Sequence, residues 1–304
     1  MPALQVRPFR RADRDQLTDL VNAHVAAVVP GVSVSVNTVL SDLERQPGES
    51  ITDPWVAERA TLVAEQRGSV VAGAHLLRYR SDAEVGAHYR NAGEIDWFVC
   101  HPPASFRQDA REAADLLMRA CLAVLARWDV RVAHADGALP APVVYGLPRN
   151  WPHIRAVYEA AGFRHVGDTE VILLARVADL PRTEPAAGVT FERTVGECGT
   201  RFTAYAAGRA LGFLEVDTTL ARPERHTRAE GLADIGNLHV DPAAHDTGLE
   251  HLLLAHAAQW LRLCGVDRLA AYLWESETAM LDHLTAAGFH ELTRTDRRWE
   301  LRPS

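Results

Sequence analysis

The sequence runs through one order of segments twice. Three short stretches mark the repetition: VVAGAHLL (70–77) matches RALGFLEV (209–216), HPP (101–103) matches VDP (240–242), and YEAAGF (158–163) matches LTAAGF (284–289). The copies are too divergent for a solenoid of stacked repeats. A chain of 304 residues with this arrangement is expected to fold as two related domains in tandem.

Hydrophobic periodicity predicts the same kinds of element in both copies. In the first copy, the pattern predicts strands or hairpins at 4–9, 61–80, 93–101, 130–135 and 171–177, and helices at 10–28, 37–46, 110–128 and 151–163. In the second, it predicts strands or hairpins at 189–194, 201–217, 234–240, 268–274 and 297–301, and helices at 248–264 and 277–289. We therefore predict two α/β (α+β) domains, residues 1–178 and 189–304, joined by a polar, proline-containing linker at 179–188.

The second copy is abridged. Only VGECG (195–199) separates its first strand from its hairpin, where the first copy has two predicted helices. One face of the second sheet is then uncovered unless the first copy, or another subunit, packs on it. We expect the two halves to fit tightly, with a homodimer as the other way to cover that face.

Composition narrows the class of protein. The net charge of −8 argues against nucleic-acid binding. The four cysteines have no metal-binding spacing, and His245, His251 and His256 are spaced so that they do not stack on one helical face, so we expect no metal. The N-terminus has no apolar signal core and no apolar run approaches the ~20 residues that span a bilayer. We expect a cytoplasmic protein without a membrane partner.

Two motifs carry a resemblance. The second copy contains HVDPAAHDTGLEHLLLAHAAQWL (239–261) followed by RLAAYLW (268–274), and the first contains NWPHIRAVYEAAGFRHVG (150–167). With the element order above, they make the chain resemble the GNAT N-acetyltransferase superfamily, twice, over nearly its whole length. The tandem arrangement is similar to that of mycothiol synthase-like double-domain proteins.

The resemblance implies acetyl-CoA as cosubstrate. The superfamily's pyrophosphate loop has the form Arg/Gln-x-x-Gly-x-Gly/Ala, in which backbone N–H groups at a helix N-terminus point at the phosphates. In the second copy His245 takes the first slot, Gly248 matches the first glycine and Glu250 replaces the last small residue. The implied CoA-binding residues are Leu238, His239, Val240, His245, Asp246, Thr247, Gly248, Leu249 and Glu250. The counterpart in the first copy, PASFRQDAR (103–111), has no glycine.

The catalytic candidates lie mainly in the first copy. Tyr158 matches the general-acid tyrosine of the superfamily's YxxxGF motif, whereas the second copy has Leu284 in that slot. Glu94 and Asp96 are two residues apart on a predicted strand, so we expect them on one face, where either could act as a base. His239 is a further candidate base because its pKa range suits proton transfer near neutrality.

Two functions are open at this point. One is acetyl-CoA-dependent N-acetylation of a small amine, with CoA at loop 245–250 and the substrate cleft at the domain junction. The other is a protein of the same fold that has lost CoA use and binds a small molecule or a partner. Glu250 and Leu284 favour the second function, and Gly248 between a strand and a helix favours the first.

Overall fold

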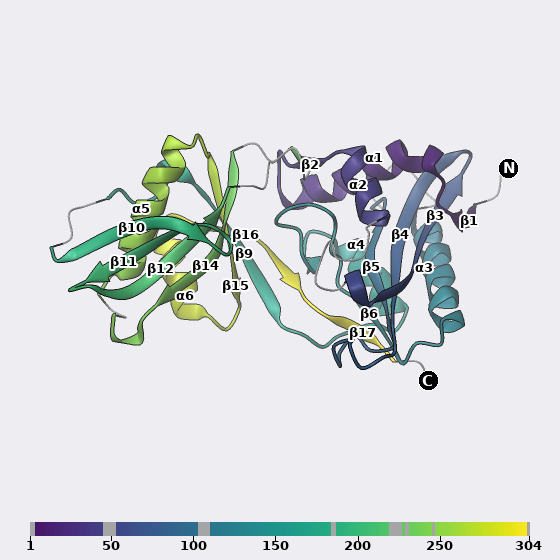
Figure 1. Ribbon diagram of the computed structural model, residues 1–304. Coiled ribbons are helices and arrows are strands. Elements are labelled where there is room, and N and C mark those ends of the chain that lie inside the picture. Colours follow the sequence, from purple (N-terminus) through teal and green to yellow (C-terminus); the bar gives the residue numbers. More distant parts are fainter. Residues whose placement is uncertain are drawn as a thin grey trace. The chain divides into compact units, whose positions relative to one another are not determined.

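The computed structural model describes residues 4–44, 53–102, 110–183, 187–218, 227–228, 231–244 and 247–302. It divides into two compact units (Figure 1). The first unit comprises Met1–Thr169 together with Thr295–Ser304, and the second comprises Glu170–Arg294. Within the described residues, no helix is both long and apolar enough to cross a membrane.

The first unit is built on a mixed seven-stranded sheet. Its strands follow the order β1 (Gln5–Pro8), β3 (Val56–Gln66), β4 (Ser69–Tyr79), β5 (Ala92–Cys100), β6 (Val132–Ala135), β17 (Trp299–Leu301) and β8 (Arg164–His165). The longest pairing is the β3–β4 hairpin, which turns at Arg67 and Gly68, both with positive φ. Shorter pieces are β2 (Ser33–Val34), β7 (Leu147–Pro148), η1 (Arg11–Asp13) and η2 (Asp53–Trp55).

Four helices pack on the two faces of this sheet: α1 (Arg14–Val28), α2 (Val36–Leu43), α3 (Ala110–Arg127) and α4 (Pro152–Ala160). The apolar stripe of α1 is buried as its sequence pattern indicates, because Leu17, Val21 and Val25 are inaccessible. A Cβ added at Gly73 would meet Leu17 of α1, and one added at Gly93 would meet Leu125 of α3. Helices α1 and α3 therefore cover opposite faces.

The second unit contains β9 (Thr169–Arg176), β10 (Val189–Gly196), β11 (Gly199–Ala206), β12 (Arg209–Asp217), β14 (Leu232–Val240), β15 (Arg268–Trp274) and β16 (His290–Asp296). Its strands follow the order β10-β11-β12-β14-β15-β9-β16. Helices α5 (Leu249–Leu263) and α6 (Thr278–Ala286), η3 (Val177–Asp179), η5 (Pro242–Ala244) and β13 (Thr227–Arg228) complete it. Only two residues separate the end of β10 from the start of β11, so the predicted abridgement is confirmed. Every residue of β10 is exposed or half-buried.

The boundaries of the two units differ from the expected domain boundaries at both ends of the second copy. Strand β9, which we expected to close the first domain, pairs antiparallel with β15 of the second unit along its length. Strand β17, which we expected to close the second domain, pairs antiparallel with β6 and β8 of the first unit (Figure 1). The exchange keeps each sheet complete, because one antiparallel strand replaces another with the same backbone hydrogen bonds.

The AAGF stretch that occurs in both copies has the same structural role in both units. Gly162 and Gly288 have φ of 92° and 106° and end helices α4 and α6 in the left-handed conformation. The following phenylalanines, Phe163 and Phe289, each donate a backbone hydrogen bond of 3.0 Å to the residue five positions earlier. This shared helix ending explains why AAGF occurs twice.

Candidate functional site

In the first unit, strand β5 loses its parallel neighbour halfway along its length. It pairs antiparallel with β4 from Gly93 to Cys100, but its parallel pairing with β6 covers only 92–95 within the described residues. The register with β4 shifts at the same place, which makes Asp96 the extra residue of a β-bulge. The two strands therefore part just after the bulge, and the edge of β5 opens there.

The second unit repeats this geometry. Strand β14 pairs antiparallel with β12 from Asp234 to Val240, while its described parallel pairing with β15 ends at Asp234. The register shift falls at Gly236, which stands where Asp96 stands in the first unit. Both units thus present the open strand edge that could accept an extended ligand by backbone hydrogen bonding.

A cavity of about 530 Å³ lies at the end of β5 in the first unit, between helices α3 and α4. Its floor is mostly apolar, and the described residues that line it are Cys100, His101, Pro102, Ala110, Arg111, Ala114, Pro152, His153, Ala156 and Val157. Its volume is in the range of ordinary small-molecule sites. The histidines and Arg111 are the polar groups at its wall.

Tyr158 lies in helix α4, directly after the cavity residue Val157. Its side chain is fully buried, with its ring against Phe98, Phe163 and Trp299 at centroid distances of 6.1, 5.4 and 6.4 Å. Its hydroxyl has no hydrogen-bond partner among the residues that the structure describes. Burial, with further contributions from nearby Cys121 and Asp96, raises the pKa of Tyr158 well above its usual value. The hydroxyl therefore keeps its proton and can donate one hydrogen bond.

Glu94 and Asp96 have different surroundings. Glu94 is buried and accepts a hydrogen bond from the hydroxyl of Tyr79, and burial raises the pKa of Glu94 to about 7. Asp96 is half-buried at the bulge. The bulge interrupts the regular alternation between them, because Trp97, opposite His75, takes the position that follows Glu94 on that face. A common face for Glu94 and Asp96 therefore stays a prediction.

The loop expected to bind pyrophosphate lies before helix α5 in the second unit. Two of its residues, His245 and Asp246, lie outside the described residues. Thr247 bonds back to the carbonyl of Ala244 through both its N–H and its hydroxyl, and Gly248 is the helix N-cap with a left-handed φ of 74°. A non-glycine residue would be strained there. Buried Leu249 and half-buried Glu250 begin the helix, so Glu250 lies in its first turn.

The other three expected CoA-binding residues lie on β14, two of them at the hydrophobic core and one at the surface. Leu238 and Val240 pack against or within the hydrophobic core of the second unit. His239 is exposed, with its ring 5.7 Å from that of Phe213. In the acid slot of this unit, Leu284 is buried in the same core. The second unit therefore has no hydroxyl where the first unit has Tyr158.

Several residues at the first site were not singled out from sequence. Cys100, His101 and His153 line the cavity, and His153 lies beside His24 with their Nε2 atoms 3.2 Å apart. Burial lowers the pKa of His24 to about 4 and also lowers that of His153. The sequence feature that could have pointed to these residues is HPP (101–103), because it follows the end of a predicted strand. It does not show which side chains of other elements lie opposite.

No protein-family model matches the chain, and no curated protein matches it. Solved structures do. A tandem GNAT protein from the clavulanic acid biosynthesis pathway superposes with a TM-score of 0.63 at 15% identity, covering 99% of this chain and 100% of its own. A GCN5-related N-acetyltransferase from Sphaerobacter thermophilus gives 0.62 at 15%, covering 99% and 96%. A glucosamine N-acetyltransferase region of a fungal multi-domain β-N-acetylglucosaminidase gives 0.62 at 14%, covering 99% of this chain and 38% of that one. The chain has the tandem GNAT fold, as its motifs predicted.

Proposed function

We propose that this chain is an acyl-CoA-dependent N-acyltransferase that acts on a small amine, with its reaction centre in the first unit. The observation that carries the proposal is the fully buried hydroxyl of Tyr158, which has no partner among the described residues and belongs to the helix that lines a cavity at the end of β5. A buried hydroxyl without a partner is costly unless a ligand supplies one. Fold alone does not fix an activity, so the site has to support it.

Acyl-CoA would supply the thioester, and the residues of the first unit would handle the protons. The amine nitrogen attacks the acyl carbon, the C–S bond breaks, and the products are an amide and free CoA thiol. Tyr158 is the candidate donor of the proton that the leaving sulfur takes, because it occupies the YxxxGF slot and its buried hydroxyl has no partner among the described residues. The open edge of β5 after Asp96 would hold the pantetheine arm through backbone groups.

A base must take the proton that the amine loses. Asp96 is the better candidate of the two carboxylates, because it is half-buried at the bulge and close enough to Tyr158 to raise its pKa. Glu94 is deeper and already accepts the Tyr79 hydroxyl. We therefore assign the base to Asp96 and a supporting role to the Glu94–Tyr79 pair.

The loop at 245–250 is the competing position for CoA. In its favour are the left-handed Gly248 and the N–H groups of the first turn of α5, an arrangement that suits phosphate. Against it is Leu284, which leaves the YxxxGF slot of that unit without a hydroxyl. His239, exposed on the open strand, would be the base if this loop were used.

Acetyl-CoA titration by calorimetry on the full chain separates these positions. Ala156→Trp fills the cavity of the first unit from its half-buried wall, and Gly248→Trp obstructs the loop of the second. Binding that survives Gly248→Trp and disappears in Ala156→Trp supports the proposal. The reverse result moves CoA to loop 245–250. No heat from the wild-type chain at millimolar acetyl-CoA would favour a protein that has lost CoA use.

A further inference from the structure

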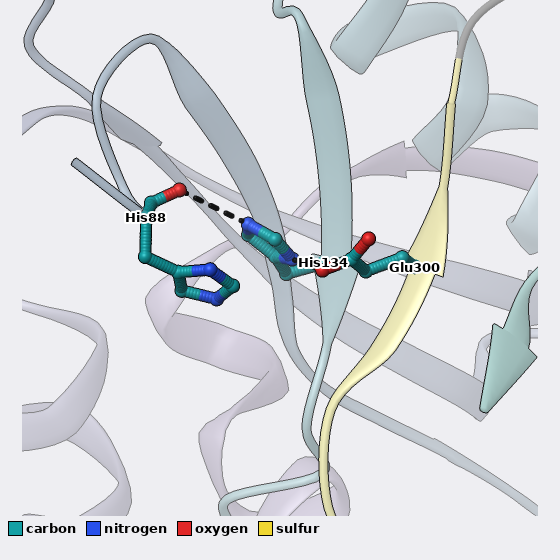
Figure 2. Close-up of side chains that lie close together, drawn as sticks. All are labelled: His88, His134 and Glu300. Carbon is teal, nitrogen blue, oxygen red and sulfur yellow. Dashed lines mark hydrogen bonds and ion pairs between the residues drawn. The ribbon is translucent and has the colours of Figure 1, made fainter. Parts of the chain in front are cut away.

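Three side chains from distant parts of the sequence meet on the sheet of the first unit, away from the cavity described above. His134 lies on β6, Glu300 on β17, and His88 in the turn before β5 (Figure 2). Glu300 is the direct antiparallel neighbour of His134, so their side chains leave the sheet on the same face. One nitrogen or oxygen from each of the three lies within 4.8 Å of the others.

The hydrogen bonds of His134 leave one ring nitrogen without a partner. Nε2 lies 3.5 Å from the backbone carbonyl oxygen of His88, which can only accept, so this contact is a hydrogen bond in the tautomer with the proton on Nε2. In that tautomer Nδ1 has a lone pair; it is buried and makes no hydrogen bond with any of the described residues. It lies 3.8 Å from a carboxylate oxygen of Glu300. Two electron-rich atoms therefore face each other in a side-chain environment that is only 4% exposed at His134.

This arrangement matches what a metal-binding histidine needs. Such a histidine usually donates its second ring N–H to a carbonyl, which fixes the tautomer and aims the other nitrogen at the ion. The carbonyl in question is held in place, because the guanidinium of Arg131 donates to the carbonyls of His88, Ala87 and Arg90 at 2.6, 2.8 and 2.7 Å. The turn that carries His88 is thus fixed before any ion binds.

We propose that His88, His134 and Glu300 form a binding site for a divalent transition-metal ion, with zinc as the preferred ion. Two imidazoles and one carboxylate are a common zinc ligand set, and water completes the tetrahedron. Ligand atoms on tetrahedral zinc lie about 3.4 Å apart. The three ligand atoms, which lie within 4.8 Å of one another, therefore have to come closer together when the ion binds. The site rests on the first unit alone and is independent of the proposed acyl transfer.

His88 is the ligand that has to move. Its ring is stacked on that of His134 at 4.3 Å between centroids, whereas a metal must lie in the plane of each ring. Because His88 is exposed, its ring can turn without disturbing the core. Arg302 is 3.8 Å from the second oxygen of Glu300 but is 83% exposed, so it can turn towards solvent.

The ion would fasten the C-terminal strand. Strand β17 has only three residues and comes from the far end of the chain, yet it lies between β6 and β8. A bond from Glu300 through the metal to His134 and His88 would hold β17 to its neighbour and to the turn. The bound ion would therefore stabilise the first unit with β17 paired between β6 and β8.

The test is titration of zinc chloride into metal-free full-length protein, followed by calorimetry, with circular dichroism to confirm folding. We expect one zinc per chain, and we expect His88→Ala and Glu300→Gln each to weaken it by at least about tenfold. His290→Ala removes an exposed histidine of the second unit and serves as the matched control, with unchanged binding. Zinc should also slow amide hydrogen exchange at 299–301 in the wild type and in the control.

Three results would overturn the proposal. They are absence of zinc binding to the wild-type chain, wild-type affinity in either His88→Ala or Glu300→Gln, and loss of affinity in His290→Ala equal to the loss in His88→Ala. Cobalt(II) gives an independent measurement, because its visible absorption reports nitrogen ligands. A spectrum that His88→Ala leaves unchanged would contradict the site in the same way.

Discussion

Glu300 lies directly opposite His134, so the last strand of the chain is paired with a strand from its middle. His134 is in turn the parallel neighbour of Glu94. The sheet that carries the proposed reaction centre is therefore completed by residues that follow the whole second unit. If β17 detaches from the sheet, the packing around Tyr158 should change, because its ring lies 6.4 Å from that of Trp299 on β17.

Replacing Trp299 tests the importance of this strand. Trp299 is 2% exposed and packs near Tyr158 and His165, with Arg155 over its ring. Trp299→Ala should lower the free energy of unfolding by about 3–5 kcal/mol, because it leaves a large cavity. Trp274→Ala, at a site 42% exposed, should cost less than about 1 kcal/mol. Equal losses in chemical unfolding would show that β17 does not hold the first unit together.

Tyr158→Phe should separate activity from stability. It removes a buried hydroxyl that has no partner in the described part of the chain, so the free energy of unfolding should stay the same or rise. If Tyr158 is the acid, the rate of CoA release with the best amine of a panel should fall by roughly 10²-fold or more. Tyr205→Phe, on β11 of the second unit, is the control and should leave the rate unchanged. An unaltered rate in Tyr158→Phe would remove the tyrosine from the mechanism.

The equivalent glycines Gly73 and Gly212 should respond unequally to alanine. A Cβ at Gly73 would lie 2.6 Å from the terminal Cδ1 of Leu17, which can move aside. A Cβ at Gly212 would lie 2.6 Å from the backbone oxygen of His239, which is fixed in the β12–β14 ladder. Gly212→Ala should therefore cost about 1–3 kcal/mol and Gly73→Ala less. The opposite order in thermal unfolding would contradict this packing.

Acidification should weaken the first unit through His24. Burial lowers the pKa of His24 to about 4, and its Nε2 faces that of His153 at 3.2 Å. Because the pKa is lower in the folded state, the stabilisation is present above the unfolded value of about 6.5 and is lost as pH falls towards 4. The loss amounts to roughly 3 kcal/mol for this residue.

The matched measurement is the pH dependence of unfolding in His24→Gln. The glutamine cannot titrate, so the variant should show a shallower fall in stability between pH 6.5 and pH 4 than the wild-type chain. Identical slopes in the two proteins would mean that folding does not lower the pKa of His24.

The helices, strands and turns could be predicted from the sequence because they depend on residues that are close together in the chain. The stripe of α1, the turn at Arg67 and Gly68 and the helix endings at Gly162 and Gly288 depend on residues close together in the chain. Strand partners do not: 171–177 and 297–301 read as ordinary strands, and either could close either sheet. The exchange of β9 and β17 therefore required the structure.

The candidate sites show the same limit. YxxxGF identified Tyr158, but its unpartnered hydroxyl depends on rings from β5 and β17. The two-residue spacing of Glu94 and Asp96 did not reveal the bulge between them, because a bulge leaves no mark in the hydrophobic pattern. His88, His134 and Glu300 have no common motif, since they meet only through strand register and one turn.

The most direct test of the proposed function is hydrogen–deuterium exchange of the full chain with and without acetyl-CoA. A reaction centre in the first unit predicts slower exchange at 97–102 on β5 and at 152–158 in α4, where the cavity and Tyr158 lie. Protection confined to 238–252 in the second unit, or no protection at saturating acetyl-CoA, would contradict it.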